Sequence, residues 1–271
     1  MADSRTLPRI VLLGAAGRMG RTIASRFLSD GKVELVGACD VEGAGSPVGL
    51  LAGAQAKGPT IVESVTDLPG DLVADIALDF STPSGTRANI RHCLEQGWDC
   101  LIGVTGFAPE DIVNFTDLAD KHHRRIILVP NFTLGVNLMI RFARVAGKVF
   151  KGIEIIEMHH DGKADAPSGT ALHTAHLIAS DRAEHAPPGP DDKSRGRIED
   201  GIPIHAVRLP GLLAHQEVLF GSQGEVLTIR HDTMDRSAFL SGIYLAIEKM
   251  PGLAPGFVNG LDWAFELREE E

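Results

Sequence analysis

The chain has 271 residues, of which 44% are hydrophobic and 23% are charged, and 26 Lys and Arg against 36 Asp and Glu give a net charge of −10. These values are ordinary for a globular protein and exclude disorder for most of the chain, and the acidic balance argues against nucleic acid or an anionic membrane as a partner. No apolar run reaches the roughly 20 residues of a membrane span, and the three cysteines show no CxxC spacing. We therefore expect a soluble, reduced protein of the cytoplasm.

The first half of the chain alternates between short apolar runs and amphipathic stretches. Apolar runs of this length predict buried strands, and the stretches between them predict helices. The expected strands are 10–13, 33–39, 76–80, 100–104 and 126–129, and the expected helices are 21–29, 83–96 and 109–123. This alternation is typical of an α/β domain of the Rossmann type, with a parallel sheet covered by helices on both faces.

The pattern changes after residue 133, where strands become clustered. The expected helices are 134–150 and 168–180, and the expected strands are 153–158, 204–209, 216–220 and 225–231. Gly221 to Gly224 predicts a hairpin between the last two strands, and the proline-rich segment 186–193 predicts a surface loop. We expect a smaller α+β domain with an open mixed sheet over 134–240, following a first domain of residues 1–133 to which 241–271 returns.

Glycines follow the first expected strand with the spacing of a nucleotide-binding turn. Gly14, Gly17 and Gly20 let the chain turn sharply into a helix and let a pyrophosphate approach the backbone, where the helix N-terminus offers N–H groups. Asp40 ends the next strand, 20 residues after Gly20, at the place where a carboxylate binds the ribose hydroxyls of a dinucleotide. Together these features predict a dinucleotide-binding site.

The residues beside Asp40 bear on the choice of cofactor. A carboxylate accepts hydrogen bonds from the 2′ and 3′ hydroxyls but repels a 2′-phosphate, for which an NADP site usually supplies an arginine. The next residue is the uncharged Val41, although Arg18 or Lys32 can reach the site from nearby loops. We therefore predict a preference for NADH, with NADPH still accepted.

The segment 157–170 is dense in reactive side chains. It leaves a strand and enters a helix that Ser168 or Thr170 can cap, so that the first N–H groups of the helix form a cradle for a carboxylate or phosphate. The basic side chains before this cradle are His159, His160 and Lys163. The segment predicts a site that transfers protons and binds an anion.

The segment 157–170 also resembles the signature of the dihydrodipicolinate reductase (4-hydroxy-tetrahydrodipicolinate reductase) family. Segments 14–20, 79–83, 102–107 and 130–137 resemble the same family in order and spacing. The resemblance implies reduction of 4-hydroxy-tetrahydrodipicolinate to tetrahydrodipicolinate by NADH or NADPH in lysine and diaminopimelate biosynthesis. It also implies a homotetramer whose second domain binds the dicarboxylate substrate and joins the subunits.

The resemblance implies roles for particular residues. His159 resembles the catalytic proton donor and acceptor, and Lys163 resembles a second proton donor. The substrate-binding residues implied are His160, Ser168, Gly169 and Thr170. The cofactor-binding residues implied are Gly14, Ala15, Ala16, Gly17, Arg18, Met19, Asp40, Gly103, Val104, Thr105, Val129, Pro130, Asn131 and Phe132. No metal ligand is implied. Val41 departs from the family, since relatives that use NADPH often have an arginine there.

The chemistry of this reaction agrees with these residue types. A substrate with two carboxylates needs cations and N–H donors, which His160, Lys163 and the start of the helix at Ser168 to Thr170 can supply. Hydride arriving at a ring conjugated to C=N leaves negative charge on nitrogen, and an imidazolium or ammonium group can protonate it.

Three other interpretations remain open. A zinc site would use His159, His160, His173 and His176, although no cysteine lies nearby. An aldehyde dehydrogenase would need a thiolate nucleophile in the catalytic domain, but Cys39, Cys93 and Cys100 all lie in the first half. A regulator that senses NADH would bind the cofactor without consuming it.

Overall fold

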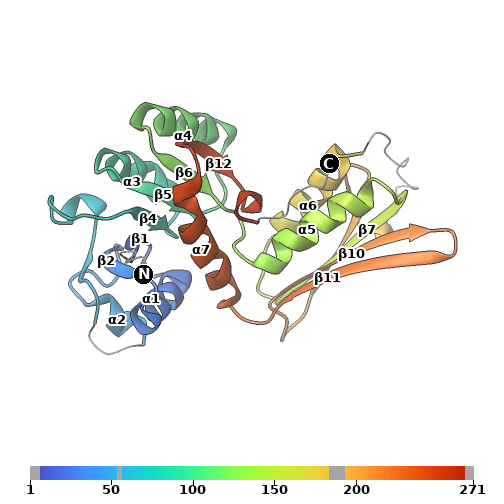
Figure 1. The fold of residues 1–271 in the computed structure, drawn as a ribbon. Coiled ribbons are helices and arrows are strands. Elements are labelled where there is room, and N and C mark those ends of the chain that lie inside the picture. The colour runs from blue at the N-terminus through green and yellow to red at the C-terminus, as the bar shows by residue number, and fades with distance from the viewer. Residues whose placement is uncertain (1–6, 54–56, 183–192, 266–271) are drawn as a thin grey trace, which may run out of the picture. The chain divides into compact units, whose positions relative to one another are not determined.

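The computed structural model describes residues 7–53, 57–182 and 193–265 (Figure 1). The chain divides into two compact units, one made of Met1–Phe132 and Leu240–Glu271 and the other of Thr133–Phe239. The second unit is thus inserted into the first along the chain. Of the proline-rich loop expected at 186–193, residues 186–192 lie outside the described residues. Among the described helices, none combines the length and the apolar character needed to cross a membrane.

The first unit is built on a seven-stranded sheet in which all neighbouring strands are parallel. The order β12-β6-β5-β4-β1-β2-β3 contains the 3-2-1-4-5-6 order of a Rossmann fold and adds one strand, so the predicted fold class is confirmed. The strands are β1 (Arg9–Leu13), β2 (Glu34–Cys39), β3 (Ile61–Val62), β4 (Ile76–Asp79), β5 (Asp99–Ile102), β6 (Arg125–Leu128) and β12 (Gly256–Asn259).

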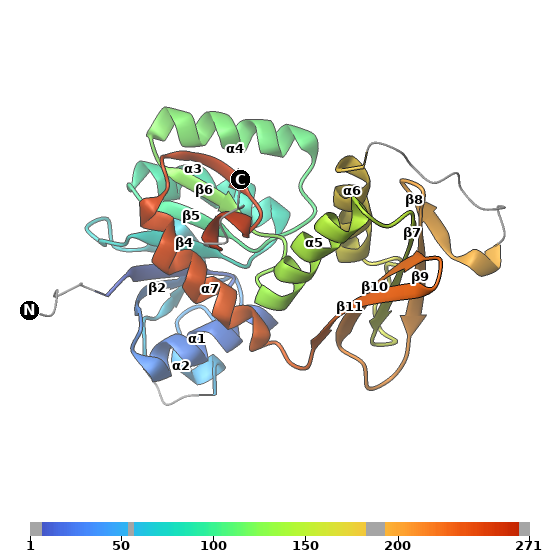
Figure 2. The same cartoon turned by 45° about the vertical axis from the view of Figure 1, so that its right-hand side comes forward.

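Helices cover both faces of this sheet (Figures 1 and 2). α3 packs against α4 on one face, whereas α1 packs with α2 on the other and contacts α7 through the rings of Phe27 and Tyr244. The helices are α1 (Arg18–Asp30), α2 (Val48–Leu51), α3 (Pro83–Glu95), α4 (Pro109–His122) and α7 (Ala238–Lys249), with 3-10 turns at Val65–Asp67, Met250–Gly252 and Asp262–Ala264.

Helix α1 begins at Arg18, earlier than the Arg21 that the sequence predicted. Gly17 is its N-cap, and Gly20 lies within its first turn. A Cβ on Gly20 would stand 2.1 Å from the carbonyl oxygen of Gly14. The third glycine of the motif is therefore needed for close packing of the helix on the loop, and it does not mark a break before the helix.

The C-terminal segment is tied to the first unit by polar contacts. The hydroxyl of Tyr244 on α7 donates to Asp30 at the end of α1, at 2.6 Å. Arg125 on β6 forms an ion pair with Asp99 at 2.8 Å and donates to the carbonyl oxygen of Leu253 at 2.7 Å. The contact of Tyr244 with Asp30 holds α7 against α1, and the contact of Arg125 with Leu253 holds the segment between α7 and β12 against β6.

The second unit has an open mixed sheet of five strands in the order β11-β10-β7-β9-β8, which confirms the predicted α+β class. β7 pairs in parallel with β9, and the other neighbours are antiparallel. The strands are β7 (Gly152–His159), β8 (Arg197–Glu199), β9 (Ile202–Arg208), β10 (Ala214–Ser222) and β11 (Glu225–Thr233), and a 3-10 turn spans Lys193–Arg195. The register places His159 beside Ala214 of β10 and Arg208 of β9.

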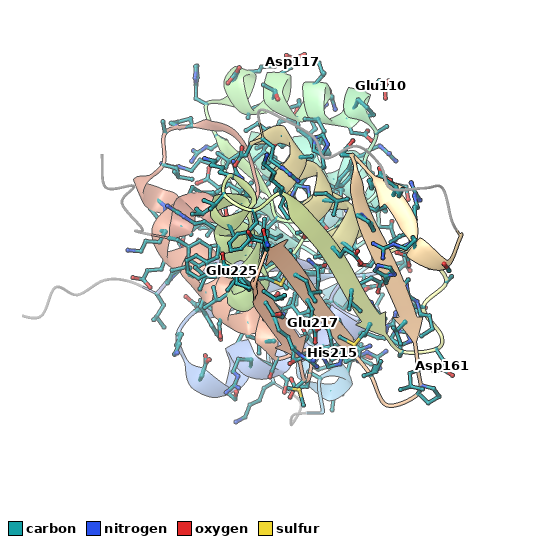
Figure 3. The ribbon with its side chains drawn as sticks, turned by 90° about the vertical axis from the view of Figure 1, so that its right-hand side faces the viewer. Glu110, Asp117, Asp161, His215, Glu217 and Glu225 are labelled. Atoms are coloured by element: carbon teal, nitrogen blue, oxygen red, sulfur yellow. The ribbon has the colours of Figure 1, made fainter. Side chains whose placement is uncertain are left out.

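Helices α5 (Leu134–Gly147) and α6 (Gly169–Ser180) pack on one face of the second sheet. The buried side chains Ile155, Val218 and Phe220 of the sheet form a core with these helices. In the described part of the unit no helix covers the opposite face, which we call the open face. Figure 3 views the sheet from this side, with His215 and Glu217 of β10 labelled.

We expect Gly242→Ala to destabilise the first unit. A Cβ at this position of α7 would stand 1.9 Å from the carbonyl oxygen of Phe132, so the helix must move away from the sheet. The free energy of unfolding, measured by urea denaturation, should fall by about 1–3 kcal/mol, as at other overpacked sites. Gly252→Ala is the control, because a Cβ there meets no atom within 4 Å. Equal effects of the two substitutions would contradict this packing.

Candidate active site

The glycine loop lies at the carboxyl end of β1, where the order of the sheet reverses. β1 lies between β2 and β4, and such a switch point is where open α/β sheets bind their ligands. Gly14 has a φ of +76°, and a Cβ there would stand 2.6 Å from backbone atoms of Phe80 and Ser81. The first glycine is therefore required both by its conformation and by the close approach of the chain after β4.

The loop presents backbone N–H groups at the start of α1. Gly17, the N-cap, has no side chain that accepts from the first turn, and its own N–H donates to the carbonyl oxygen of Gly14 at 3.2 Å. The first N–H groups of a helix have no partner within the helix, and they carry a partial positive charge. These residues fit the pyrophosphate of a dinucleotide.

Asp40 directly follows β2, and the backbone holds its carboxylate in place. Oδ2 accepts the N–H of Ala16 at 2.9 Å, and Oδ1 accepts the N–H of Glu42 at 3.0 Å. The neighbouring Val41 is 80% exposed. The carboxylate is thus fixed beside the glycine loop, with an uncharged and accessible side chain next to it.

The other two predicted cofactor segments lie at the same edge of the sheet. Residues 103–105 follow β5 and residues 129–132 follow β6, and parallel strands bring these ends together. A Cβ on Gly103 would stand 2.4 Å from the ring of Phe80, which in turn contacts the ring of Phe132 with centroids 5.6 Å apart. Phe80, which was not among the predicted site residues, therefore packs between the glycine loop and these two segments.

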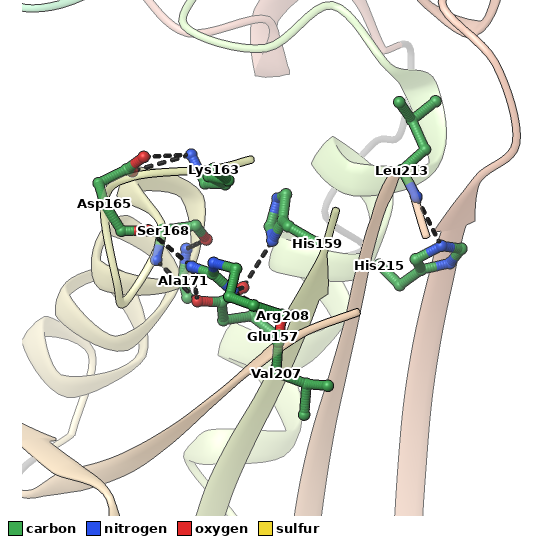
Figure 4. Close-up of polar contacts among 10 residues, drawn as sticks. All are labelled: Glu157, His159, Lys163, Asp165, Ser168, Ala171, Val207, Arg208, Leu213 and His215. Atoms are coloured by element: carbon green, nitrogen blue, oxygen red, sulfur yellow. Dashed lines mark hydrogen bonds and ion pairs between the residues drawn. The ribbon is translucent and has the colours of Figure 1, made fainter. Parts of the chain in front are cut away.

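In the second unit, the buried carboxylate of Glu157 is the centre of the predicted catalytic segment (Figure 4). Glu157 is fully buried on β7, and its Oε2 accepts from Nδ1 of His159 at 2.5 Å. Arg208 of β9 donates to both carboxylate oxygens, at 2.9 and 2.8 Å. Oε1 also accepts the N–H of Ser168 at 3.0 Å. One carboxylate therefore joins His159, the neighbouring strand and the start of α6.

The loop between β7 and α6 holds the second predicted catalytic residue. Nζ of Lys163 donates to both oxygens of Asp165, at 2.7 and 2.8 Å, and the lysine side chain is 22% exposed. Arg208 donates to the carbonyl oxygen of Asp165 at 2.6 Å, which ties the loop to β9. In Figure 4, His159 and the Lys163–Asp165 pair lie on the same side of the Glu157–Arg208 pair.

The predicted substrate-binding residues surround the start of α6. Of the two caps that the sequence allowed, Ser168 is the one used, since its hydroxyl accepts the N–H of Ala171 at 3.2 Å. Gly169 and Thr170 belong to the first turn, and a Cβ on Gly169 would meet no atom within 4 Å. His160 directly follows β7 and begins the loop that leads to this turn. The start of the helix is thus accessible to an anion.

Hydrogen bonds keep the carboxylates of this site ionised. Burial alone would raise the pKa of Glu157, but hydrogen bonds from His159 and Arg208 outweigh it and lower the pKa below its usual value. The ammonium group of Lys163 lowers the pKa of Asp165. The hydrogen bonds to Glu157 raise the pKa of Arg208, so both members of this ion pair stay charged near neutral pH.

The sequence assigned no role to Glu157 or Arg208, although the structure brings both into contact with the predicted site. Glu157 is the first residue of the segment 157–170 but one of two glutamates in its strand, and Arg208 ends a strand that also contains His205, so neither charge alone pointed to a role. Their pairing was hidden because the two strands are separated in the chain by α6 and β8.

The structure also bears on two of the alternative interpretations. Cys39, Cys93 and Cys100 are all buried, and burial raises the pKa of Cys39 to about 12, which is unsuited to a nucleophilic thiolate. Among the described residues, no three His, Cys, Asp or Glu side chains converge as they would around a metal ion. His176, one of the four histidines of the alternative zinc site, pairs with Asp200 at 3.0 Å.

Two family models match almost the whole chain. One, described as the N-terminus of dihydrodipicolinate reductase, matches residues 8–132, and the other, described as its C-terminus, matches residues 135–262. The chain belongs to the dihydrodipicolinate reductase family. This confirms the resemblance inferred from the motifs and makes the chain an oxidoreductase. The family depends on a pyridine nucleotide and carries out a reduction step of lysine biosynthesis.

Individual relatives agree with the family models. The chain is 42% identical to the 4-hydroxy-tetrahydrodipicolinate reductase of Geobacillus thermodenitrificans, over 95% of this chain and 99% of the relative. A dipicolinate-bound dihydrodipicolinate reductase from Paenisporosarcina sp. TG-14 has a similar structure, with a TM-score of 0.82 and 37% identity over 94% of this chain and 98% of that one. An amine dehydrogenase from Mycobacterium smegmatis shares the fold alone, with a TM-score of 0.69 and 14% identity over 98% of both chains.

Proposed function

We propose that this member of the dihydrodipicolinate reductase family reduces 4-hydroxy-tetrahydrodipicolinate to tetrahydrodipicolinate, with NADH as the preferred cofactor. The reaction consumes one NADH and one proton and releases NAD⁺ and water. The observation that carries the proposal is the segment 157–170, in which two basic side chains stand beside an accessible helix start. The relatives named for this reaction support it.

His159 and Lys163 are the proposed proton donors. Loss of the 4-hydroxyl of the substrate as water leaves a C=C bond conjugated to the C=N group; when bound, the nicotinamide would supply a hydride to this conjugated system, and the chain must supply the proton. His159 lies at the end of β7 with Nδ1 engaged by Glu157, so its other nitrogen is left for the substrate. Asp165 holds the ammonium group of Lys163 in the following loop. Both groups can therefore be aimed at a ring bound at the start of α6.

The start of α6 is the proposed site for a carboxylate of the substrate. Gly169 and Thr170 present N–H groups there, Ser168 caps the turn, and His160 lies in the loop that precedes it. A carboxylate bound to these groups gains charge-assisted hydrogen bonds and the partial positive charge of the helix. The dipicolinate in the Paenisporosarcina structure is a dicarboxylate of the kind that this cradle suits.

The preference for NADH rests on the surroundings of Asp40. Its carboxylate lies beside the glycine loop, where it suits two ribose hydroxyls and repels a 2′-phosphate. The adjacent Val41 is exposed and offers no compensating charge. The other cofactor-binding residues, Gly14–Met19, 103–105 and 129–132, serve either nucleotide.

The open face of the second sheet is the proposed contact between four copies of the chain. Val207 and Val226, which are 39% and 70% exposed, lie on strands of this sheet. The same face carries the ion pairs His215–Asp232 and Arg230–Glu217. A sheet face that mixes apolar side chains with paired charges is suited to bury against a second copy of itself.

Loss of either proton donor should lower turnover far more than cofactor binding. We expect His159→Gln and Lys163→Ala each to reduce kcat by about 100-fold or more, the usual contribution of general acid catalysis. The Kd for NADH, from fluorescence titration, should change little. His176→Gln and Lys148→Ala are matched controls on exposed side chains. Turnover near the wild-type value in both test variants would exclude the assignment, and NADH binding without consumption by the wild type would favour a regulator.

A cation beside Asp40 should change the choice of cofactor. We expect Val41→Arg to raise the ratio of kcat/KM for NADPH to that for NADH by about tenfold, because the guanidinium can pair with the 2′-phosphate. The loss of NADH or NADPH absorbance with freshly generated substrate measures both rates. Val113→Arg, at a 62% exposed position of α4, is the control. A wild-type enzyme that already favours NADPH would contradict the proposed preference.

Charges introduced on the open face should break up the tetramer. We expect the wild type to have the mass of four chains in light scattering, and the double variant Val207→Asp, Val226→Asp to have a smaller one, since buried carboxylates repel each other. The control is Val145→Asp, Val149→Asp, at positions of 61% and 77% exposure in and after α5. If the control dissociates and the test variant does not, the contact lies elsewhere.

A further inference from the structure

We propose that Glu157 is the positioning residue for His159: its carboxylate holds the proton on Nδ1 of the imidazole, so that Nε2 alone exchanges protons with the substrate. The inference rests on the proposed role of His159 and adds to it a residue to which no role has been assigned. It also gives Arg208 a function, because the guanidinium balances the charge of Glu157.

The hydrogen bonds around Glu157 determine the tautomer of the His159 imidazole. Each carboxylate oxygen accepts two: Oε2 from His159 and Arg208, and Oε1 from Ser168 and Arg208. Glu157 is fully buried, so water does not replace any of these donors. An ionised carboxylate only accepts, and Nδ1 must therefore carry the hydrogen at the 2.5 Å contact.

This constraint determines where His159 is reactive. With Nδ1 protonated, the neutral ring has a bare Nε2 and the imidazolium has an Nε2–H, so the proton enters and leaves at one atom. The ring does not have to turn between the two states. A carboxylate behind a catalytic histidine acts in this way in other enzymes, where it orients the ring and stabilises its charged form.

Each of the two carboxylates near His159 has a cationic partner other than the imidazole. Glu157 of β7 is balanced by Arg208 of β9, and Asp165 of the loop is balanced by Lys163. Without Arg208, the buried carboxylate of Glu157 would have only the imidazole of His159 as a cationic partner.

Two uncharged residues of neighbouring elements lie close to this group. β10 places Ala214 opposite the histidine, and α6 contributes its cap, Ser168. Two further titratable residues, His160 and Asp161, follow His159 directly in the chain at the start of the loop. The Glu157–Arg208 pair is therefore the buried charge pair that acts on the imidazole.

The substitution Glu157→Gln separates this role from simple packing. A glutamine keeps the shape of the side chain but replaces one accepting oxygen with an amide NH₂. The backbone N–H of Ser168 and the guanidinium of Arg208 can only donate, whereas Nδ1 of His159 can become an acceptor. The amide NH₂ should therefore turn to His159 and move the ring hydrogen to Nε2.

The first readout is the ¹⁵N NMR spectrum of the protein with labelled histidine, which distinguishes the two neutral tautomers without any turnover. His159→Gln identifies the His159 signals. We expect a neutral ring with hydrogen on Nδ1 in the wild type, on Nε2 in Glu157→Gln, and again on Nδ1 in Glu157→Asp, which retains a carboxylate. Asp99→Asn is the matched control, because it alters another largely buried carboxylate paired with an arginine, in the first unit. It should leave the His159 signals unchanged.

The second readout is the effect on kcat relative to KM. We expect Glu157→Gln to lower kcat at neutral pH by about 10- to 100-fold, because the neutral ring then carries its hydrogen on Nε2 and cannot accept a proton there. The KM for NADH should stay near the wild-type value, and Glu157→Asp should recover part of kcat. An Nδ1–H tautomer and a wild-type kcat in Glu157→Gln would overturn the inference. Wild-type turnover in His159→Gln would instead overturn the proposed function, and the tautomer of the Glu157 variants would still be measurable.

Discussion

A buried charge has to be fully paired, and this constraint organises the second unit. Removing a carboxylate from water costs several kcal/mol unless hydrogen bonds and an opposite charge replace the solvent. Glu157 meets this requirement with donors from three places in the chain, namely His159 of β7, Arg208 of β9 and the N–H before α6. The same contacts that satisfy the carboxylate therefore hold His159, strand β9 and the start of α6 close to one another.

The first unit depends on a different constraint, the close approach of backbone segments at the switch point of its sheet. Gly14 touches the chain after β4, Gly20 touches Gly14, and Gly103 leaves room for the ring of Phe80. Each contact is closer than a Cβ would allow. The close contacts of the first unit thus depend on positions without a side chain, whereas the segment 157–170 of the second unit is held by hydrogen bonds and ion pairs between side chains.

Much of the fold was readable from sequence because its signals are local. The apolar runs of β1, β4, β5 and β6 and the glycine spacing each depend on a few consecutive residues. The strands that were not predicted, β3, β8 and β12, have two to four residues, too few to show a period, and exist through their pairing with longer neighbours. The contact of Arg208 with Glu157 was missed because it depends on the parallel pairing of β7 with β9, which no local pattern indicates.

The insertion of the second unit has a consequence for how the chain matures on the ribosome. Synthesis delivers β1 to β6 first, then the whole inserted unit, and only afterwards α7 and β12. Until β12 has left the exit tunnel, β6 is an edge strand with unpaired backbone groups, and the face later covered by α7 is bare. The nascent parallel sheet is therefore incomplete throughout most of translation. During that time the exposed edge of β6 is a surface that a chaperone for unpaired strands would bind.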